Sequence, residues 1–449
     1  MSKKILLFGA GKSATILIEY LIKESLKNNW RLIVCDADIV LTRSKTGNNE
    51  NTEAVSIDVL NETERKNLVQ SADIVISMLP AALHFLIAKD CVEFSKNLLT
   101  ASYVDKNIKS LEKEIIEKKL LFLCEMGLDP GIDHMSAMKM INSIKEKNGK
   151  IGSFVSHCGG LIAPESDNNP WHYKITWNAR NIVLAGKDGA EYIIDDQTVK
   201  VPYRSIFRNC PLLNVIDNYP LCWYPNRDSE HYIDLYNLQG IKTFIRTTLR
   251  HPAFARGWNK FVNMQLTATN DFESIKNCKT YADWLTVKTA PYFTNKDWNN
   301  YLQMYLTDPF KNEFDRQIVF LGLRSKELLP ENFKCSADIL QNIIEEKLAM
   351  KPNDKDMIVM LHELEYELRD NKYEVRSLLI VKGDNSMKTA MAKTVGLPLG
   401  IATKLILQGN IKTTGLHIPI IPEIYEPVLK ELEENGIVFN EINLPDSRI

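Results

Sequence analysis

Short apolar runs alternate with amphipathic stretches along the first 125 residues of the chain. Within residues 14–26, Leu17, Ile18 and Leu21 recur at helical spacing. Such alternation of strands and helices predicts a parallel sheet with helices on both faces. The runs that predict buried strands are Ile5–Phe8, Leu32–Cys35, Ile74–Met78, Leu98–Ala101 and Leu120–Cys124.

The pattern changes after residue 125. Residues 126–256 hold strand-like runs separated by Pro, Gly and Asn, which predicts a mixed α/β domain. From 257 to 370 the apolar positions recur at helical spacing, as in Leu361, Leu364 and Leu368, and predict an inserted helical domain. Residues 371–394 are expected to return to the mixed domain, and the tail, about 395–449, to pack back on the first α/β part.

Composition narrows the class of protein without identifying it. With 55 basic and 57 acidic side chains the net charge is −2, so no partner such as nucleic acid or an anionic membrane is indicated. The eight cysteines are scattered without a C-x-x-C pair, which indicates neither a metal site nor a disulfide framework. No apolar run is expected to be long enough to cross a bilayer, and the start lacks a signal-peptide core, so a reducing cytoplasm is the expected compartment.

The first predicted strand leads into a G-x-G-x-x-A pattern that opens a helix. Its first glycine permits a tight turn, its second lets a pyrophosphate approach the backbone, and the small alanine lets helix and strand pack closely. The free N–H groups of the helix start then bind the pyrophosphate. A bare structural turn is the alternative, but the strand before and the helix after favour a Rossmann-type dinucleotide site. Its candidate residues are Gly9, Gly11, Lys12, Ser13 and Ala14.

Polar residues at the ends of the following strands extend this cofactor site. Asp36 ends the second strand, where a carboxylate accepts hydrogen bonds from a ribose and repels a 2′-phosphate. The sequence therefore favours NAD, and NADP is the alternative because Arg43 lies nearby. Asp58-Val59 follows the next extended run, near the expected adenine edge, and Ser77 ends the fourth strand beside the expected nicotinamide path.

Three further segments lack the pattern of a core. Thr100–Tyr103 ends a strand with hydroxyl groups, at the edge where α/β sheets bind ligands. Glu125–His134 combines turn formers, acids and a histidine, and Cys158–Glu165 is a double-glycine loop that enters a proline turn. Each alone is also compatible with a simple turn, and Asp133 with a helix cap.

With these segments the sequence resembles the saccharopine dehydrogenase family, in its glutamate-forming branch. The strings GLDPGIDH and CGGLIAPE are the most specific. Two positions depart from the family: Ile162 replaces a proline, and Asp36 stands where NADP-using relatives carry residues that accept a phosphate. The resemblance spans essentially the whole chain through Gly9–Ala14, Ser77–Pro80, Thr100–Val104, Gly127–His134, Cys158–Glu165, Asn169-Pro170, Tyr173-Lys174, Trp177, Arg180, Tyr224–Ser229 and Thr248–Pro252.

The resemblance implies oxidation of saccharopine, a secondary amine that joins the lysine side-chain carbon to the nitrogen of glutamate. Hydride passes to the nicotinamide, and the imine is hydrolysed to 2-aminoadipate 6-semialdehyde and glutamate. Because this substrate has three carboxylates, bidentate arginines are the expected anchors. The implied substrate residues are Ser102, Tyr103, Arg227, Thr248, Leu249 and Arg250, and those near the nicotinamide are Leu128, Asp129 and Trp177.

The reaction needs a base that deprotonates the amine and activates water. Asp129 is the preferred candidate and Tyr103 the second, whereas His134 is expected to be structural. One alternative is a carboxyspermidine dehydrogenase, which Arg227 and Arg250 disfavour because a polyamine lacks paired carboxylates at one end. The other is a non-catalytic nucleotide-binding scaffold, which the intact polar loops disfavour. A small-molecule substrate and a homodimer are expected.

Overall fold

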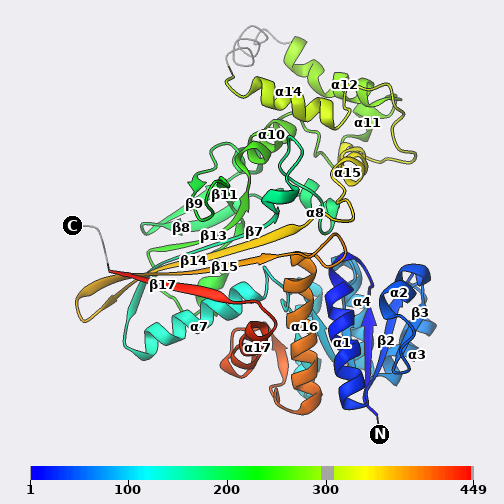
Figure 1. Cartoon of the computed structure of the whole chain (residues 1–449), viewed down its shortest axis with the longest axis vertical. Coiled ribbons are helices and arrows are strands. Elements are labelled where there is room, and N and C mark those ends of the chain that lie inside the picture. Colours follow the sequence, from blue (N-terminus) through cyan, green and yellow to red (C-terminus); the bar gives the residue numbers. More distant parts are fainter. Residues whose placement is uncertain (1, 295–307, 446–449) are drawn as a thin grey trace.

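The computed structural model describes residues 2–294 and 308–445 and has a parallel sheet at its N-terminal side (Figure 1). The order of its strands is β16-β6-β5-β4-β1-β2-β3. All of their pairings are parallel, which confirms the predicted Rossmann-type fold. The strands are β1 (Lys4–Phe8), β2 (Arg31–Asp36), β3 (Thr52–Ser56), β4 (Ile74–Ser77), β5 (Asn97–Thr100), β6 (Leu121–Leu123) and β16 (Gly415–His417).

Helices cover both faces of this sheet because its strands are apolar at successive positions. Along β1, Ile5 and Leu7 join the core beneath α1, while Leu6 and Phe8 join a separate core beneath α4. The helices of the parallel-sheet domain are α1 (Thr15–Asn28), α2 (Ile39–Thr46), α3 (Glu62–Ser71), α4 (His84–Glu93), α5 (Lys106–Ser110) and α6 (Glu112–Glu117), and the tail adds α16 (Ala390–Gln408) beside α1.

A ten-stranded mixed sheet forms the second domain. Its long strands run in the order β13-β7-β14-β15-β17, and α7 (Ile132–Glu146) packs on them, with α17 (Pro422–Glu434) against α7. Its strands are β7 (Lys150–Ile162), β8 (Ala190–Ile194), β9 (Gln197–Val201), β10 (Leu212–Leu213), β11 (Leu221–Pro225), β12 (Arg227–Asp228), β13 (Thr243–Arg250), β14 (Asp356–Leu368), β15 (Asn371–Lys382) and β17 (Phe439–Pro445). Two short helices, α8 (Ala179–Val183) and α9 (His231–Leu235), lie in its loops.

A helical unit follows β13 and lies at the far end of the mixed sheet from the parallel-sheet domain (Figure 1). Buried Trp171, Trp258 and Trp284 are at its centre. The prediction that helix continues to residue 370 is wrong, because residues 356–368 form β14. A central strand that is covered on both faces is apolar at successive positions. Its apolar residues therefore also include some at helical spacing, and the sequence pattern alone does not distinguish it from a helix. The helices are α10 (Pro252–Asn263), α11 (Phe272–Ile275), α12 (Tyr281–Thr294), α14 (Lys311–Phe320) and α15 (Ser336–Lys347).

The C-terminal tail is divided between the two sheets. As expected, α16 and β16 add to the parallel-sheet side, but β17 pairs with β15 in the mixed sheet. Among the described residues, α16 is by length and composition able to cross a membrane, contrary to the expectation that no apolar run is long enough. Because 78% of that apolar stretch is buried, α16 has the surroundings of a core helix that joins the two domains.

Glycines let α16 approach α1 closely. A Cβ at Gly396 would lie 2.8 Å from the backbone nitrogen of Leu17, and one at Gly400 would lie 2.5 Å from the Tyr20 ring. Backbone cannot move aside as a flexible side chain does, so the contact at Gly396 requires glycine.

We expect Gly396→Ala to lower the free energy of unfolding by about 1–3 kcal/mol, although alanine is the better helix former, because overpacking outweighs propensity. Urea denaturation of both proteins measures the difference. Gly152→Ala is the matched control, since a Cβ there meets its nearest heavy atom at 3.9 Å. Stability of Gly396→Ala at or above that of the wild type would contradict the close contact.

Candidate functional site

The glycine-rich loop after β1 has the geometry that a bound pyrophosphate requires. Gly9 has a φ of 100° and donates its N–H to the Cys35 carbonyl at 2.8 Å, and a Cβ there would lie 2.8 Å from the Met78 carbonyl oxygen. At Gly11 a Cβ would meet nothing within 4 Å. The backbone at Gly11 is therefore open to a phosphate, and buried Ala14 closes the packing behind it.

Asp36 holds this loop from the end of β2. Its carboxylate accepts hydrogen bonds from the Ala10 N–H at 2.7 Å and from the Asp38 N–H at 3.0 Å. The carboxylate keeps lone pairs for a ribose hydroxyl, because each of its oxygens accepts more than one hydrogen bond. Lys45 of α2, which sequence reasoning missed, donates to the Gly11 carbonyl at 2.7 Å. Burial lowers the pKa of Lys45 to about 8.

The remaining cofactor candidates lie at the same sheet edge, because the carboxyl ends of parallel strands share one edge. Exposed Asp58 and half-buried Val59 follow β3, and buried Ser77 ends β4. Lys12 and Ser13 begin the helical turn after the glycine loop.

A hydrogen-bonded chain joins the ends of β4 and β5. The Ser77 hydroxyl lies 2.7 Å from Nδ1 of His84, and the Ser102 hydroxyl lies 2.7 Å from Nε2. Burial lowers the pKa of His84 to about 4, so its imidazole is neutral at pH 7 and has one donor and one acceptor. Ser77 was predicted to contact the cofactor and Ser102 the substrate, whereas His84, which links them, was not predicted from the sequence.

Two carboxylates and one guanidinium form a buried centre between the parallel-sheet domain and the mixed sheet. The Nη2 of Arg246 donates to Asp129 at 2.5 Å and to Asp133 at 2.6 Å. The guanidinium carbon lies 4.3 Å from the centre of the Tyr232 ring, and the Arg246 residue is only 4% exposed. No motif singled out Arg246, although its position on an alternating strand four residues before Arg250 was an available signal.

The two acids of this centre differ in acidity. Burial raises the pKa of Asp129 above the ordinary range, and the charge of Asp133 adds to the rise against the opposing effect of Arg246. For Asp133, burial is outweighed by His134, by Arg246 and by the Gly131 N–H, so that its pKa is lowered. Asp133 is thus the permanent partner of Arg246, and Asp129 is the acid suited to exchanging a proton near neutral pH.

Tyr103 and His134 border this centre in different ways. Burial raises the pKa of Tyr103, and the negative charge of Asp129 raises it further, so its phenol stays protonated and is suited to donating a hydrogen bond. His134 is fully buried, with Nδ1 2.6 Å from the Tyr236 hydroxyl and Nε2 2.9 Å from a Glu125 oxygen. Both ring nitrogens are occupied, as in a structural histidine.

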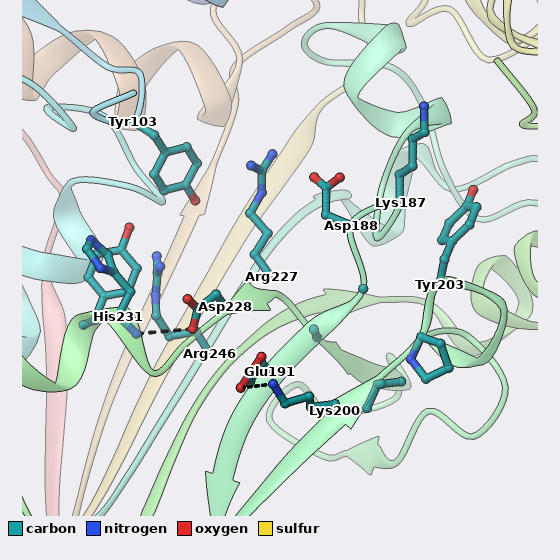
Figure 2. Close-up of a pocket in the computed structure, with 15 residues that line it drawn as sticks. Tyr103, Lys187, Asp188, Glu191, Lys200, Tyr203, Arg227, Asp228, His231 and Arg246 are labelled. Atoms are coloured by element: carbon teal, nitrogen blue, oxygen red, sulfur yellow. Dashed lines mark hydrogen bonds and ion pairs between the residues drawn. The ribbon is translucent and has the colours of Figure 1, made fainter. Parts of the chain in front are cut away.

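A cavity of about 630 Å³ opens beside Arg246. Figure 2 shows Tyr103 and Arg246 on one side of Arg227, and Lys187, Asp188 and Tyr203 on the other. The guanidinium carbon of Arg227 lies 5.1 Å from the centre of the Tyr103 ring. Tyr103 comes from the loop after β5 and Arg227 from β12, so the cavity joins the cofactor edge to the mixed sheet. Arg227 forms no ion pair with a carboxylate in the part of the chain that the structure describes.

Arg250 continues the face of β13 that carries Arg246. Residues two apart in a strand share a face, so Arg246, Thr248 and Arg250 point to one side of the sheet. Arg250 is 5% exposed, its Nη1 donates to the Leu249 carbonyl at 2.7 Å, and its Nε has no partner among the described residues. Aromatic rings of Tyr173 and Phe254 flank it, and no carboxylate in the described chain pairs with it.

Three other candidate residues offer less to a ligand. Leu249 points to the opposite face of the sheet, where its side chain packs in the core with Leu161 and Val359. It therefore cannot contact a substrate in this cavity except through its backbone. Leu128 is 5% exposed, and half-buried Trp177 donates to the Tyr173 hydroxyl at 3.4 Å.

Comparison with known proteins gives matches over nearly the whole chain. Residues 5–123 match the model described as the saccharopine dehydrogenase NADP binding domain, and residues 127–437 match that of the saccharopine dehydrogenase C-terminal domain. A curated relative, alpha-aminoadipic semialdehyde synthase of Mus musculus, is 33% identical over 446 residues, which are 98% of this chain but 47% of the relative. The chain thus spans about half the length of that relative.

Fungal relatives are matched along their full length. Saccharopine dehydrogenase [NADP(+), L-glutamate-forming] of Saccharomyces cerevisiae is 31% identical, and the match covers 98% of this chain and 99% of the relative. The solved apo structure of the saccharopine dehydrogenase (L-Glu forming) of that yeast covers 99% of this chain and 100% of its own, with a TM-score of 0.87 and 29% identity. The resemblance seen in the sequence is confirmed, and the chain belongs to the saccharopine dehydrogenase family.

Proposed function

We propose that the chain oxidises saccharopine reversibly, with NAD(P)+ and water, to 2-aminoadipate 6-semialdehyde and glutamate. The observation that carries the proposal is the buried Arg250 guanidinium, which has no carboxylate partner in the described chain. An uncompensated buried charge is costly, and a bidentate carboxylate is the ligand that matches a guanidinium. Arg227, whose guanidinium is also unpaired with an acid, provides a second carboxylate anchor beside the cavity.

The residues of the chain fit a nicotinamide dinucleotide. The Gly9–Ala14 loop would hold its pyrophosphate, because the backbone is open at Gly11, and the tight turn at Gly9 leaves no room for a Cβ beside the Met78 carbonyl. When bound, this cofactor accepts a hydride from the carbon next to the amine nitrogen. Neutral His84, between Ser77 and Ser102, keeps this edge free of a charge that would compete for the substrate.

Proton transfer is assigned to Asp129. Its pKa is raised by burial, which makes it a stronger base than an ordinary carboxylate and suits it to taking the amine proton. Arg246 holds it in place and shares its charge with Asp133. Tyr103, which lines the cavity and remains protonated, would donate a hydrogen bond to the substrate.

The choice between the two cofactors depends on Asp36. The family domain and the fungal relatives are named for NADP, which the sequence analysis kept as its alternative. We propose that this chain nevertheless uses NAD well, since the carboxylate of Asp36 lies against the loop and disfavours a 2′-phosphate. Lys45 and Arg43 of α2 are the cations through which NADP would be accepted.

We also propose a compartment and an assembly for the chain. The eight cysteines are all free thiols, which supports the reducing cytoplasm, although the mouse relative is named mitochondrial. A homodimer is the assembly we propose, and light scattering of the purified protein tests it.

Asp36→Asn should raise the ratio of catalytic efficiency with NADP to that with NAD by about tenfold, because it removes a charge while keeping an acceptor for the loop. Steady-state kinetics with both cofactors measure this ratio. Asp38→Asn is the control, since its side chain caps α2, and it should change the ratio less. Wild-type efficiency that is higher with NADP than with NAD would refute the proposed preference.

The efficiency of saccharopine oxidation should fall as the pH is lowered through the pKa of Asp129, because the protonated acid cannot act as a base. This acid limb should lie above the ordinary aspartate value of about 3.9, since burial raises the pKa. Asp129→Asn should remove the limb and lower turnover by about 10²–10⁴-fold. A pH profile that keeps the same limb in Asp129→Asn would assign the base elsewhere.

Arg227→Lys should lower the catalytic efficiency for saccharopine by about tenfold to a hundredfold, because lysine keeps the charge but loses the two-pronged contact. Cofactor affinity, measured by fluorescence, should hardly change, since the dinucleotide is bound by the other domain. Arg208→Lys, an exposed arginine outside the cavity lining, is the matched control. Equal damage to cofactor and substrate binding, or none to either, would remove Arg227 from the substrate site.

A further inference from the structure

We propose that Cys210 and Cys222 form a thiol pair that a hydroperoxide oxidises to a disulfide, and that this disulfide weakens the binding of a carboxylate substrate at Arg250. The effect on the substrate rests on the proposed function. Formation of the disulfide does not depend on it.

The two cysteines meet beside strand β11. Cys210 lies two residues before β10, and Cys222 is the second residue of β11. The strands are antiparallel, with Leu212 opposite Cys222, and the Trp223 N–H donates to the Pro211 carbonyl at 3.1 Å. Both cysteines are free thiols, and the Cys210 S–H donates to the Ile206 carbonyl at 4.0 Å. The paired backbone thus holds the two cysteines on neighbouring chain segments, where each shifts the pKa of the other.

Disulfide formation needs one sulfur that attacks the oxidant and a second sulfur that resolves the intermediate. The surroundings of the two cysteines assign these roles. The Cys210 S–H lowers the pKa of the Cys222 thiol, and the guanidinium groups of Arg256 and Arg250 lower it further against the effect of burial. The pKa of Cys210 is raised, first by its interaction with Cys222 and then by burial. The thiolate is the nucleophilic form of cysteine, so the lowered pKa favours Cys222, which is 1% exposed, as the sulfur that attacks, and half-buried Cys210 as the sulfur that resolves.

The chemistry balances with a hydroperoxide as the oxidant. The Cys222 sulfur attacks one peroxide oxygen, the O–O bond breaks, and one water leaves with a sulfenic acid on Cys222. The Cys210 sulfur then displaces the hydroxyl group, which takes the Cys210 proton and leaves as a second water. Two thiols are oxidised to one disulfide, and hydrogen peroxide is reduced to two molecules of water. A thiol reductant reverses the step by exchange.

Arg250 is the residue through which the disulfide reaches the substrate site. Cys222 and Arg250 are directly opposite each other across the β11–β13 pair, and in such pairs the side chains are neighbours. In the segment before β10, Phe207 packs on Tyr224 with ring centres 4.5 Å apart. Tyr224 of β11 lies opposite Thr248 of β13. Joining Cys210 to Cys222 therefore ties the segment before β10 to the residue that lies opposite Arg250.

The experiment treats the full-length protein with hydrogen peroxide, blocks the remaining thiols, and cleaves the chain before Asp217, the acidic residue between the two cysteines. Mass spectrometry should then find the two peptides joined, and dithiothreitol should separate them. The Michaelis constant for saccharopine should rise about tenfold in the oxidised protein, as for a weakened charge-assisted contact, with cofactor affinity unchanged.

Two variants serve as comparisons. Cys210→Ser should keep the activity of the reduced protein, form no joined peptide and lose the sensitivity to peroxide. Cys278→Ser removes another half-buried free thiol from the helical unit and should respond to peroxide as the wild type does. Circular dichroism confirms that each variant is folded.

The outcomes separate the thiol pair from the proposed function. Absence of the joined peptide after peroxide treatment overturns the proposal. A joined peptide with an unchanged Michaelis constant overturns its link to Arg250. If the reduced protein does not oxidise saccharopine at all, the proposed function fails, while the peptide mapping still decides whether the pair forms.

Discussion

The ion pairs of Arg246 with Asp129 and Asp133 hold together the parts of the molecule on which the site depends. Asp129 and Asp133 belong to the segment that leads out of the parallel sheet into α7, and Arg246 belongs to the middle of the mixed sheet. All three side chains are largely buried, and loss of one member of such a pair typically costs about 3–5 kcal/mol. The contact therefore fixes the distance between the cofactor edge and the cavity.

This centre has one negative charge more than it has positive charges, but burial is what raises the pKa of Asp129, since Arg246 lowers that pKa by more than Asp133 raises it. Positive charge is instead in excess at Arg250, further along β13, and at Arg227 of β12. Neither guanidinium has a carboxylate partner in the described chain. The site thus places a proton-accepting acid beside Arg246 and unpaired guanidinium groups at Arg250 and Arg227, while the cavity lining also contains the carboxylates of Asp188, Glu191 and Asp228. The polarity is built by adjacent positions of one strand face and does not require a long-range field.

Local strand–helix units explain why most of the parallel sheet could be predicted, since each of the strands β1 to β5 precedes a helix of the same domain. Strand β14 could not be predicted in the same way, because its apolar run is explained by its place between β7 and β15, and β7 is distant in sequence. In the site, Gly9 and Gly11 were predictable because backbone geometry demands glycine. Arg246 was missed because its partner Asp133 is 113 positions away.

The unpaired guanidinium of Arg250 also discriminates between the classes of substrate that the sequence left open. A polyamine would bring positive charge toward Arg250, which pairs with no carboxylate in the described chain, although Asp188, Glu191 and Asp228 line the cavity beside Arg227. A tricarboxylic secondary amine instead neutralises both guanidinium groups, while its amine points toward Asp129. Because the unpaired buried charge at Arg250 is relieved only in the second case, binding energy favours the carboxylate-rich substrate over the polyamine.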